Sequence, residues 1–285
     1  MPEVLRSPGY WVTVWRRFLR DPVAVAAALV VLGLILMAVF APWIAPQDPF
    51  VGKSLLRLKP PGTEGYPLGT DELGRDMLSR LIHGARISLF MGIVPVICAL
   101  LVGAAIGVAA GYSGGWTNAL MMRTVDVFFA FPSVLLAVAL AGALGPGMFN
   151  GLIALTLVFI PPIARVAESV TTGVRTRDYV EAAKASGAGA LLIIRKHVLG
   201  NVLGPIFVYA MSLIAVSMIL AAGLSFLGLG VKPPQPDWGL MLNTLRTAMY
   251  TQPLLCALPG VMIFITSIAF NLMTDGLRSA MDIKT

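Results

Sequence analysis

The sequence predicts an all-α polytopic membrane protein with six transmembrane helices. The chain has 285 residues, of which 57% are hydrophobic and only 12% are charged, and its mean hydropathy is +0.84. A soluble domain usually carries about 25% charged residues. Long charge-free runs also recur along the chain, and each approaches the roughly 20 apolar residues that a helix needs to cross a bilayer. These observations favour one helical bundle in a membrane over one or two soluble domains.

The net charge of +7 and the pI of about 9.7 fit this fold class. Such values could indicate nucleic-acid binding, but lysines and arginines that flank membrane spans explain them better because they face anionic lipid. The two cysteines and two histidines lack the spacing of a metal site or of a disulfide framework. We therefore expect no metal and no cofactor in this chain.

Residues 1–22 are predicted to form an N-terminal segment at the cytoplasmic face of the membrane or in its interface. Trp11 and Trp15 stand close to Arg16 and Arg17 in this segment. The pattern suits a short helix that lies in the membrane interface. The alternative is simple anchoring of the first span by its flanking tryptophans and arginines, and the sequence does not separate the two.

Residues 23–285 are predicted to form one transmembrane domain. Its six spans are expected at about 23–45, 87–111, 125–144, 148–168, 203–228 and 254–274, with an outer loop at 46–86 and a polar loop at 175–202. The third and fourth spans are divided by Gly145-Pro146-Gly147, because a turn belongs at the membrane surface and irregular backbone does not belong in lipid. The first run is longer than the apolar part of a secretory signal and is predicted to be an uncleaved anchor.

Six spans place both termini on the same side of the membrane. More lysines and arginines fall on that side than on the other, if residues 46–86 are counted as outside. The positive-inside rule then predicts that both termini are cytoplasmic.

The second predicted span carries a small residue at every fourth position. These residues share one face of a helix, and small residues there let another helix approach closely. The predicted packing residues are Ala99, Gly103, Gly107 and Gly111.

A few polar or aromatic residues within or between the later spans are candidates for a gate or a transport path. Each could instead bond to a neighbouring helix or anchor at the interface. The candidates are Tyr209, Ser212, Ser217, Trp238 and Asn271.

Acids and bases are absent from the centres of the predicted spans, and Asp126, Arg165 and Glu168 lie near span ends. Proton-driven carriers usually keep such groups inside the membrane, so proton coupling is disfavoured. The sequence also lacks an HExxH motif, a nucleophile–base pair and paired intramembrane carboxylates. We predict that the chain is not an enzyme and that any energy for transport comes from elsewhere.

The outer loop mixes acidic and basic residues in the stretch GTDELGRDMLSRLIHGAR. It could contact a protein that delivers a substrate, or it could be a self-bridged element that packs on the bundle. The charged residues concerned are Asp71, Glu72, Asp76, Arg75, Arg80 and Arg86.

The polar stretch DYVEAAKASGAG, residues 178–189, lies between two long apolar runs. Asp178 and Glu181 have the spacing of a capping box, and the alanines that follow favour a helix. Gly187 and Gly189 are expected to let the chain turn, because glycine tolerates a positive φ. A surface helix of this size could dock into a groove on a soluble partner, and an ordinary solvated loop helix is the alternative.

A second short amphipathic helix is expected after the glycines. Its apolar face is predicted to contain Leu191, Ile194 and Val198.

YVEAAKASGAG resembles the EAA motif of permease subunits of ATP-binding-cassette (ABC) importers. Further stretches resemble the dipeptide, oligopeptide and nickel branch of that family. In chain order they are WRRFLRDP, PLGTDELGRDMLSRLIHGARISL (67–89), GYSGGWTNALMMRTVDVFFAFP (111–132), LSFLGLGVKPPQPDWG (224–239) and AFNLMTDGLR (269–278). On these motifs the chain is identified as a member of this branch, similar to its C-type dipeptide permease subunits.

The resemblance implies a type I ABC importer permease fold in a bacterial inner membrane, with a cytoplasmic coupling helix that sits in a cleft on an ATPase subunit. The residues that would couple to the ATPase are Asp178, Tyr179, Glu181, Ala182, Ala183 and Gly187. Three positions depart from the usual family pattern. Gly200 stands in place of a proline, Tyr66 stands in place of a histidine, and Thr274 precedes Asp275 in place of a glycine.

The resemblance also implies the partners. They are a second homologous permease subunit in a heterodimer, two ATPase subunits that bind ATP and Mg and carry out hydrolysis, and an extracytoplasmic substrate-binding protein. The implied cargo is a dipeptide or oligopeptide, and nickel or a metal chelate is the alternative. A channel and an intramembrane enzyme are the competing classes of protein. Co-purification of ATPase subunits would distinguish an importer subunit from both.

Overall fold

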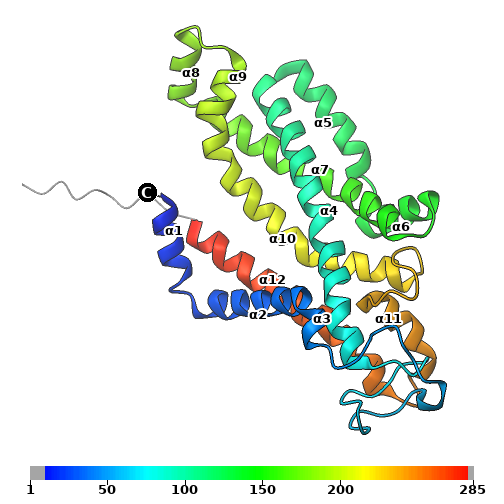
Figure 1. The fold of residues 1–285 in the computed structure, drawn as a ribbon. Coiled ribbons are helices and arrows are strands. Elements are labelled where there is room, and N and C mark those ends of the chain that lie inside the picture. Colours follow the sequence, from blue (N-terminus) through cyan, green and yellow to red (C-terminus); the bar gives the residue numbers. More distant parts are fainter. Residues whose placement is uncertain (1–9, 282–285) are drawn as a thin grey trace, which may run out of the picture.

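The computed structural model of the protein describes residues 10–281, and within them every regular element is a helix, which confirms the predicted all-α class (Figure 1). The α-helices are α1 (Tyr10–Phe18), α2 (Pro22–Val39), α3 (Ala41–Ile44), α4 (Met77–Ser113), α5 (Gly115–Phe129), α6 (Ser133–Leu144), α7 (Met148–Arg175), α8 (Asp178–Ala185), α9 (Ala190–Ile193), α10 (Leu199–Phe226), α11 (Trp238–Leu245) and α12 (Pro253–Met281). The shorter helical segments are η1 (Ser54–Leu56), η2 (Ile194–Val198) and η3 (Arg246–Ala248).

Five helical stretches in the described residues are long and apolar enough to cross a membrane, and the bent pair α5–α6 can count as a sixth. The five are α2, α4, α7, the continuous stretch from α9 to α10, and α12. α10 is central to the bundle because it contacts α4, α7, α11 and α12. α4 and α7 form the most extensive helix pair, while α2 packs mainly on α12.

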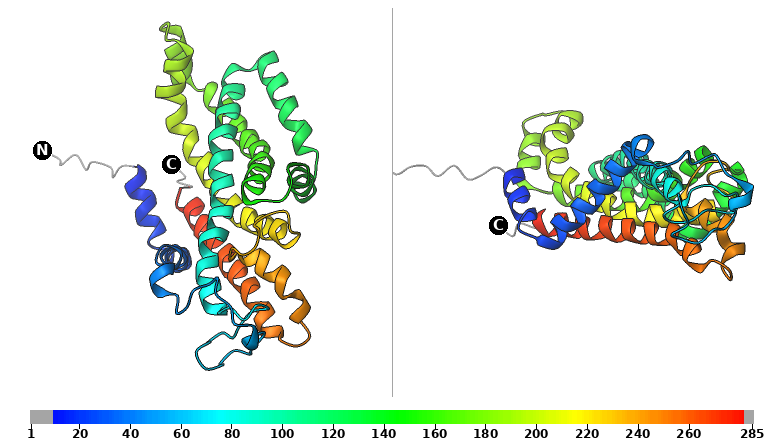
Figure 2. Two further views of the ribbon diagram at one scale, coloured as in Figure 1. Left: turned by 45° about the vertical axis from the view of Figure 1, so that its right-hand side comes forward. Right: turned by 60° about the horizontal axis from the view of Figure 1, so that its bottom comes forward.

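The two ends of the bundle differ (Figure 1). α8 and α9 lie at the top of Figure 1, and we call this the α8 end. α11 and the long loop between α3 and α4 lie at the opposite end, which we call the loop end (Figures 1 and 2). α1 lies beside the C-terminal end of α12 in all views (Figure 2).

The predicted third span, residues 125–144, does not form one helix. The chain breaks between α5 and α6, which meet at an angle of 86°. The break falls at Phe131-Pro132, where proline has no N–H to donate and disfavours helical backbone in the residue before it. The turn predicted at Gly145-Pro146-Gly147 does occur, with φ of 85° at Gly145 and 157° at Gly147.

The predicted second span was expected to begin at residue 87, but α4 begins at Met77. Asp76 caps the helix by accepting a hydrogen bond from the backbone N–H of Ser79 at 2.8 Å. Residues 77–86 include the charged Arg80 and Arg86, so this part of α4 is not recognised by a search for purely apolar runs. α12 likewise extends beyond its predicted end at residue 274 to Met281, whereas α2 ends at Val39, short of the predicted residue 45.

The stripe of small residues on α4 packs against α7. A Cβ atom added to Gly103 would lie 2.9 Å from the carbonyl oxygen of Ile160, and one added to Gly111 would lie 2.7 Å from that of Glu168. At Gly107 an added Cβ would lie 2.5 Å from the Cβ of Ala167. Ala99 is fully buried on the same face. These backbones therefore approach so closely that only small residues fit between them.

The long loop at the loop end is organised by the buried carboxylate of Asp71. Its oxygens accept hydrogen bonds from the Arg75 Nε at 2.6 Å and from the backbone N–H groups of Leu73 and Arg75, both at 2.9 Å. The Arg80 Nε lies 3.1 Å from the same carboxylate, and Glu72 pairs with Arg75 at 3.0 Å. These ion pairs support the interpretation of this region as a self-bridged element that packs on the bundle.

Replacing Asp71 with asparagine is expected to destabilise this end of the protein. The change leaves the buried guanidinium groups of Arg75 and Arg80 without their shared counter-charge, and breaking such a buried ion pair costs about 3 to 5 kcal/mol. Thermal unfolding of the purified protein in detergent, followed by circular dichroism and by proteolysis of the loop, measures the loss. The matched control is Glu64→Gln, since Glu64 is an exposed carboxylate of the same loop. An unchanged Tm and cleavage pattern for Asp71→Asn would contradict this account.

Candidate functional site

α8 projects from the α8 end of the bundle as a short exposed helix (Figure 1). Four of the six predicted coupling residues lie within the first five positions of α8, and all four are exposed to solvent. Ala183 is half-buried. Gly187 lies exposed just beyond the helix. The four exposed residues are Asp178, Tyr179, Glu181 and Ala182.

Few contacts hold α8 on the bundle. Val180 is its one buried residue and is part of the main apolar core. The ring of Tyr179 lies 6.4 Å from that of His197, and the Lys184 ammonium lies 5.5 Å from the centre of the Tyr112 ring on α4. A cation over an aromatic face at this distance adds a modest attraction. Most of the α8 surface thus remains available to another protein.

α8 ends in a Schellman motif at Gly187. The N–H of Ala188 donates to the carbonyl of Ala183 at 3.2 Å, and the N–H of Gly187 donates to that of Lys184 at 2.9 Å. Gly187 has a φ of 81°, the left-handed conformation that glycine adopts without a steric penalty. The turn expected from Gly187 is therefore present. Gly189 has an ordinary φ of −66° and does not contribute a positive φ.

The capping box expected from Asp178 and Glu181 does not form. The residue that caps α8 is Arg177, and it makes no side-chain hydrogen bond to the helix. Asp178 is instead the first helical residue. Both carboxylates lie in the first turn, where they interact favourably with the positive end of the helix dipole.

The segment after α8 is not a separate amphipathic helix. α9, the π-helical segment η2 and α10 form one continuous helix from Ala190 to Phe226. The predicted apolar face is wrong at Leu191, which is exposed, while Ile193 and Val198 are buried. A π segment widens the helix locally, so the inward-facing residues no longer follow the simple spacing. As a result α8 is linked through one short turn to a helix that crosses the whole bundle.

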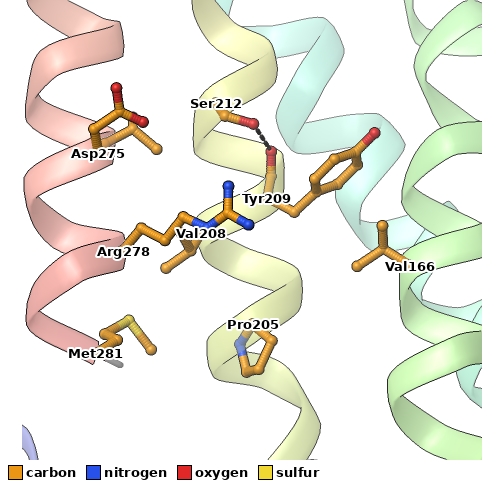
Figure 3. Close-up of a pocket in the computed structure, with 9 residues that line it drawn as sticks. Val166, Pro205, Val208, Tyr209, Ser212, Asp275, Arg278 and Met281 are labelled. Atoms are coloured by element: carbon orange, nitrogen blue, oxygen red, sulfur yellow. Dashed lines mark hydrogen bonds between the residues drawn. The ribbon is translucent and has the colours of Figure 1, made fainter. Parts of the chain in front are cut away.

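A cavity of about 540 Å³ opens between α7, α10 and α12 (Figure 3). Tyr209 and Ser212, two of the predicted path residues, line it on α10. Arg278 extends from α12 toward α10 in Figure 3, and Asp275 lies one turn away on the same helix. The other lining residues are Val166, Pro205, Val208, Thr274 and Met281.

A second cavity of about 230 Å³ lies beside the bend between α5 and α6. Tyr209 lines this cavity as well as the first one. The exposed aromatic side chains of Phe128, Phe129 and Phe131 form one wall. α5, α6, α7 and α10 thus share a hollowed face that carries both aromatic and polar groups.

α5 and α7 also carry a charge pair, whose two residues the sequence predicts only to lie near span ends. Asp126 on α5 and Arg165 on α7 form an ion pair, and both side chains are about half exposed. Nearby, the Asn118 amide on α5 donates to the Glu168 carboxylate on α7 at 2.7 Å. Charged groups on membrane helices almost always face the bundle interior or a water-filled cavity. We infer that the surface around the Asp126–Arg165 pair on α5 and α7 is covered by protein or water and not by lipid.

Three further predicted path residues do not line the cavity of about 540 Å³ between α7, α10 and α12. Ser217 is fully buried between helices, and Asn271 is exposed on α12. Trp238 is fully buried, and its indole N–H donates to the carbonyl of Leu81 at 3.0 Å. Its burial against Gly84 of α4 is inconsistent with anchoring at the membrane interface.

Asp237 connects α11 to α4 at the loop end through hydrogen bonds of its side chain. Its carboxylate accepts hydrogen bonds from the Ser88 hydroxyl at 2.8 Å and from the backbone N–H of Leu240 at 3.0 Å. Burial raises the pKa of the Asp237 carboxyl, and these hydrogen bonds oppose the shift. No group of three or more His, Cys, Asp or Glu side chains able to hold a metal ion occurs in residues 10–281.

Two family descriptions match the chain. Residues 103–284 match the "binding-protein-dependent transport system inner membrane component", and residues 9–61 match the "N-terminal TM domain of oligopeptide transport permease C". The chain is 42% identical to the glutathione transport system permease protein GsiD of Pectobacterium atrosepticum, over 98% of this chain and 92% of that protein. It is also 42% identical to the di/tripeptide transport system permease protein DppC of Pseudomonas aeruginosa, over 95% of this chain and 91% of that protein.

Solved structures show a similar fold. An inward-facing structure of the MetNI methionine ABC transporter matches 72% of this chain and 97% of its own chain, with a TM-score of 0.59 and 20% identity. The crystal structure of an amino acid ABC transporter with histidines matches 69% of this chain and 91% of its own, with a TM-score of 0.54 and 16% identity.

Proposed function

The chain belongs to the family of binding-protein-dependent transport system inner membrane components, the membrane permease subunits of ABC importers, and on that premise we propose that it forms half of the path by which a bacterial importer takes up di- or oligopeptides. The relatives at 42% identity are named for glutathione and for di- and tripeptides, which favours a peptide-type cargo. The chain is a transport subunit and not an enzyme.

The observation that carries this proposal is the placement of α8. It is exposed, it is held by a single buried residue, and it continues almost directly into α7 on one side and into the helix Ala190–Phe226 on the other. An ATPase subunit that binds α8 and moves as a rigid body would therefore pull on two helices of the bundle at once. The proposed ATPase partners would bind the ATP and Mg and supply the energy, and this chain would need no cofactor of its own.

The hollowed face formed by α5, α6, α7 and α10 is the proposed half of the path. Its exposed ion pair between Asp126 and Arg165 is unsuited to lipid, and the cavities on both sides of Tyr209 lie along it. A second, homologous permease subunit would close the path by presenting its own equivalent face. An extracytoplasmic binding protein would deliver the peptide at the loop end.

The proposal assigns the α8 end to the cytoplasm and the loop end to the outside of an inner membrane, with both termini cytoplasmic. This orientation can be tested with single cysteines, after Cys98 and Cys256 have been replaced by serine and alanine. A membrane-impermeant maleimide applied to intact spheroplasts should label Glu64→Cys in the outer loop and should label Glu181→Cys in α8 only after lysis. The reverse labelling pattern would overturn the orientation.

Uptake itself is tested with the chain reconstituted in proteoliposomes together with its partner permease, its ATPases and its binding protein. Radiolabelled dipeptide, tripeptide and glutathione should accumulate only when ATP and the binding protein are both present. Uptake without ATP would indicate a channel. Failure of ATPase subunits to co-purify with the chain would reject the importer assembly.

A further inference from the structure

α1 is a nine-residue helix with two distinct surfaces. Val14 and Phe18 are 3% and 7% exposed, and they pack with Ala24 of α2 and Ala280 of α12 in a small apolar cluster. Trp11 and Trp15 are 64% and 60% exposed. At 100° per residue, the apolar arc of the helix continues from Val14 and Phe18 through the tryptophans to Leu19. The contact with α12 therefore covers only part of the apolar surface of α1.

The position of α1 along the chain restricts what can cover the rest. α2 starts at Pro22 and is a charge-free helix of high hydropathy, so its first turn marks a boundary of the membrane. Asp21 caps that turn by accepting from the backbone N–H groups of Val23 and Ala24 at 3.0 and 3.2 Å. Because a turn of only residues 19–21 separates the two helices, α1 lies at the level of the lipid headgroups.

The remaining surface of α1 is basic. Arg16, Arg17 and Arg20 are exposed, and residues 10–20 contain no acidic side chain to balance them. Asp21 is the next acid along the chain, and its carboxylate accepts hydrogen bonds at the start of α2. An exposed apolar arc with tryptophans beside a cationic arc is the surface of a helix that lies in the interface of an anionic membrane.

We propose that α1 is a binding surface for anionic phospholipid headgroups, with Arg16, Arg17 and Arg20 as the phosphate-binding residues and Trp11 and Trp15 inserted among the acyl chains. The bound lipid would hold the C-terminal end of α12 through the apolar cluster that Val14 and Phe18 form with Ala24 and Ala280. Arg278 and Met281 on that end of α12 line the cavity between α7, α10 and α12. Anionic lipid is therefore expected to order one wall of this cavity.

The experiment uses the purified full-length chain in its complex, exchanged into nanodiscs that contain phosphatidylcholine and phosphatidylglycerol in equal amounts. Native mass spectrometry of the complex released from the nanodiscs then measures how many phosphatidylglycerol and phosphatidylcholine molecules remain bound to it. Each basic residue near an anionic surface strengthens binding about fivefold. Replacing all three arginines by glutamine should therefore reduce the preference for phosphatidylglycerol on the order of a hundredfold. The control Lys53→Gln, Arg57→Gln, Lys59→Gln removes three exposed cations from the loop end and should keep the preference.

A second measurement tests the depth of α1 without relying on charge. Brominated phosphatidylcholine should quench part of the tryptophan fluorescence of the wild-type complex, and Trp11→Phe with Trp15→Phe should reduce this quenching. Quenching of the exposed Trp43 and Trp116 should remain. Equal loss of lipid in the two triple variants, or no quenching from Trp11 and Trp15, would overturn the proposal and would indicate that a protein partner covers α1. Both readouts are independent of transport, so their failure is distinguishable from failure of the proposed import function.

Discussion

Replacing Glu181 with lysine is expected to abolish the proposed ATP-driven uptake while the protein still inserts into the membrane. Glu181 is exposed in the first turn of α8 and makes no ion pair with another described residue. Reversing its charge costs the isolated helix only about 0.3 to 1 kcal/mol through the helix dipole. At an interface with an ATPase, the loss of a hydrogen-bonded charge costs about 2 to 5 kcal/mol, which corresponds to a roughly thirtyfold or greater loss of affinity.

The measurement has two parts, uptake in proteoliposomes and retention of the ATPase subunits on the affinity-tagged permease. Both should fall together for Glu181→Lys. Glu64→Lys, which reverses the charge of an exposed residue in the long loop between α3 and α4, is the control and should leave ATPase retention unchanged. Normal uptake by Glu181→Lys would remove α8 as the coupling element, since the substitution places an opposite charge at the centre of its exposed surface.

Replacing Gly107 with leucine is expected to prevent the bundle from assembling. A Cβ atom at this position would lie well inside contact distance of the Ala164 carbonyl oxygen and 2.5 Å from the Cβ of Ala167. The obstructing atoms belong to the backbone and to a Cβ of α7, so a rotamer change cannot relieve the overlap. Overpacking of a well-packed core costs typically 1 to 3 kcal/mol and sometimes more, and this site joins the two helices with the most extensive contact.

Membrane yield and the size-exclusion profile in detergent should both deteriorate for Gly107→Leu. Gly33→Leu on α2 is a matched control, because Gly33 is an exposed glycine of another apolar helix with no atom within 4 Å of an added Cβ. It should be tolerated. A monodisperse Gly107→Leu protein with a wild-type Tm would show that α4 and α7 can separate without loss of the fold.

Features encoded by neighbouring residues could be predicted without coordinates. The apolar runs, the helical stretch after Arg177, the turn at Gly187 and the small-residue stripe on α4 depend on local composition or on helical spacing. Each of these appears in the structure at or near its predicted place, except the third apolar run, which is broken between α5 and α6. The family resemblance rested on the same kind of signal, since its motifs are contiguous stretches of sequence.

Other features depend on partners that are distant in the chain, and the packed fold was needed to reveal them. α4 can begin at Met77 because the charge of Arg80 is paired with the carboxylate of Asp71. A rule that counts only apolar residues cannot predict this ion pair. The ion pair between Asp126 and Arg165 joins two helices, and neither residue is distinctive alone. Burial of a charge or of a large ring costs free energy unless a particular neighbour compensates, and only the three-dimensional arrangement of the helices supplies that neighbour.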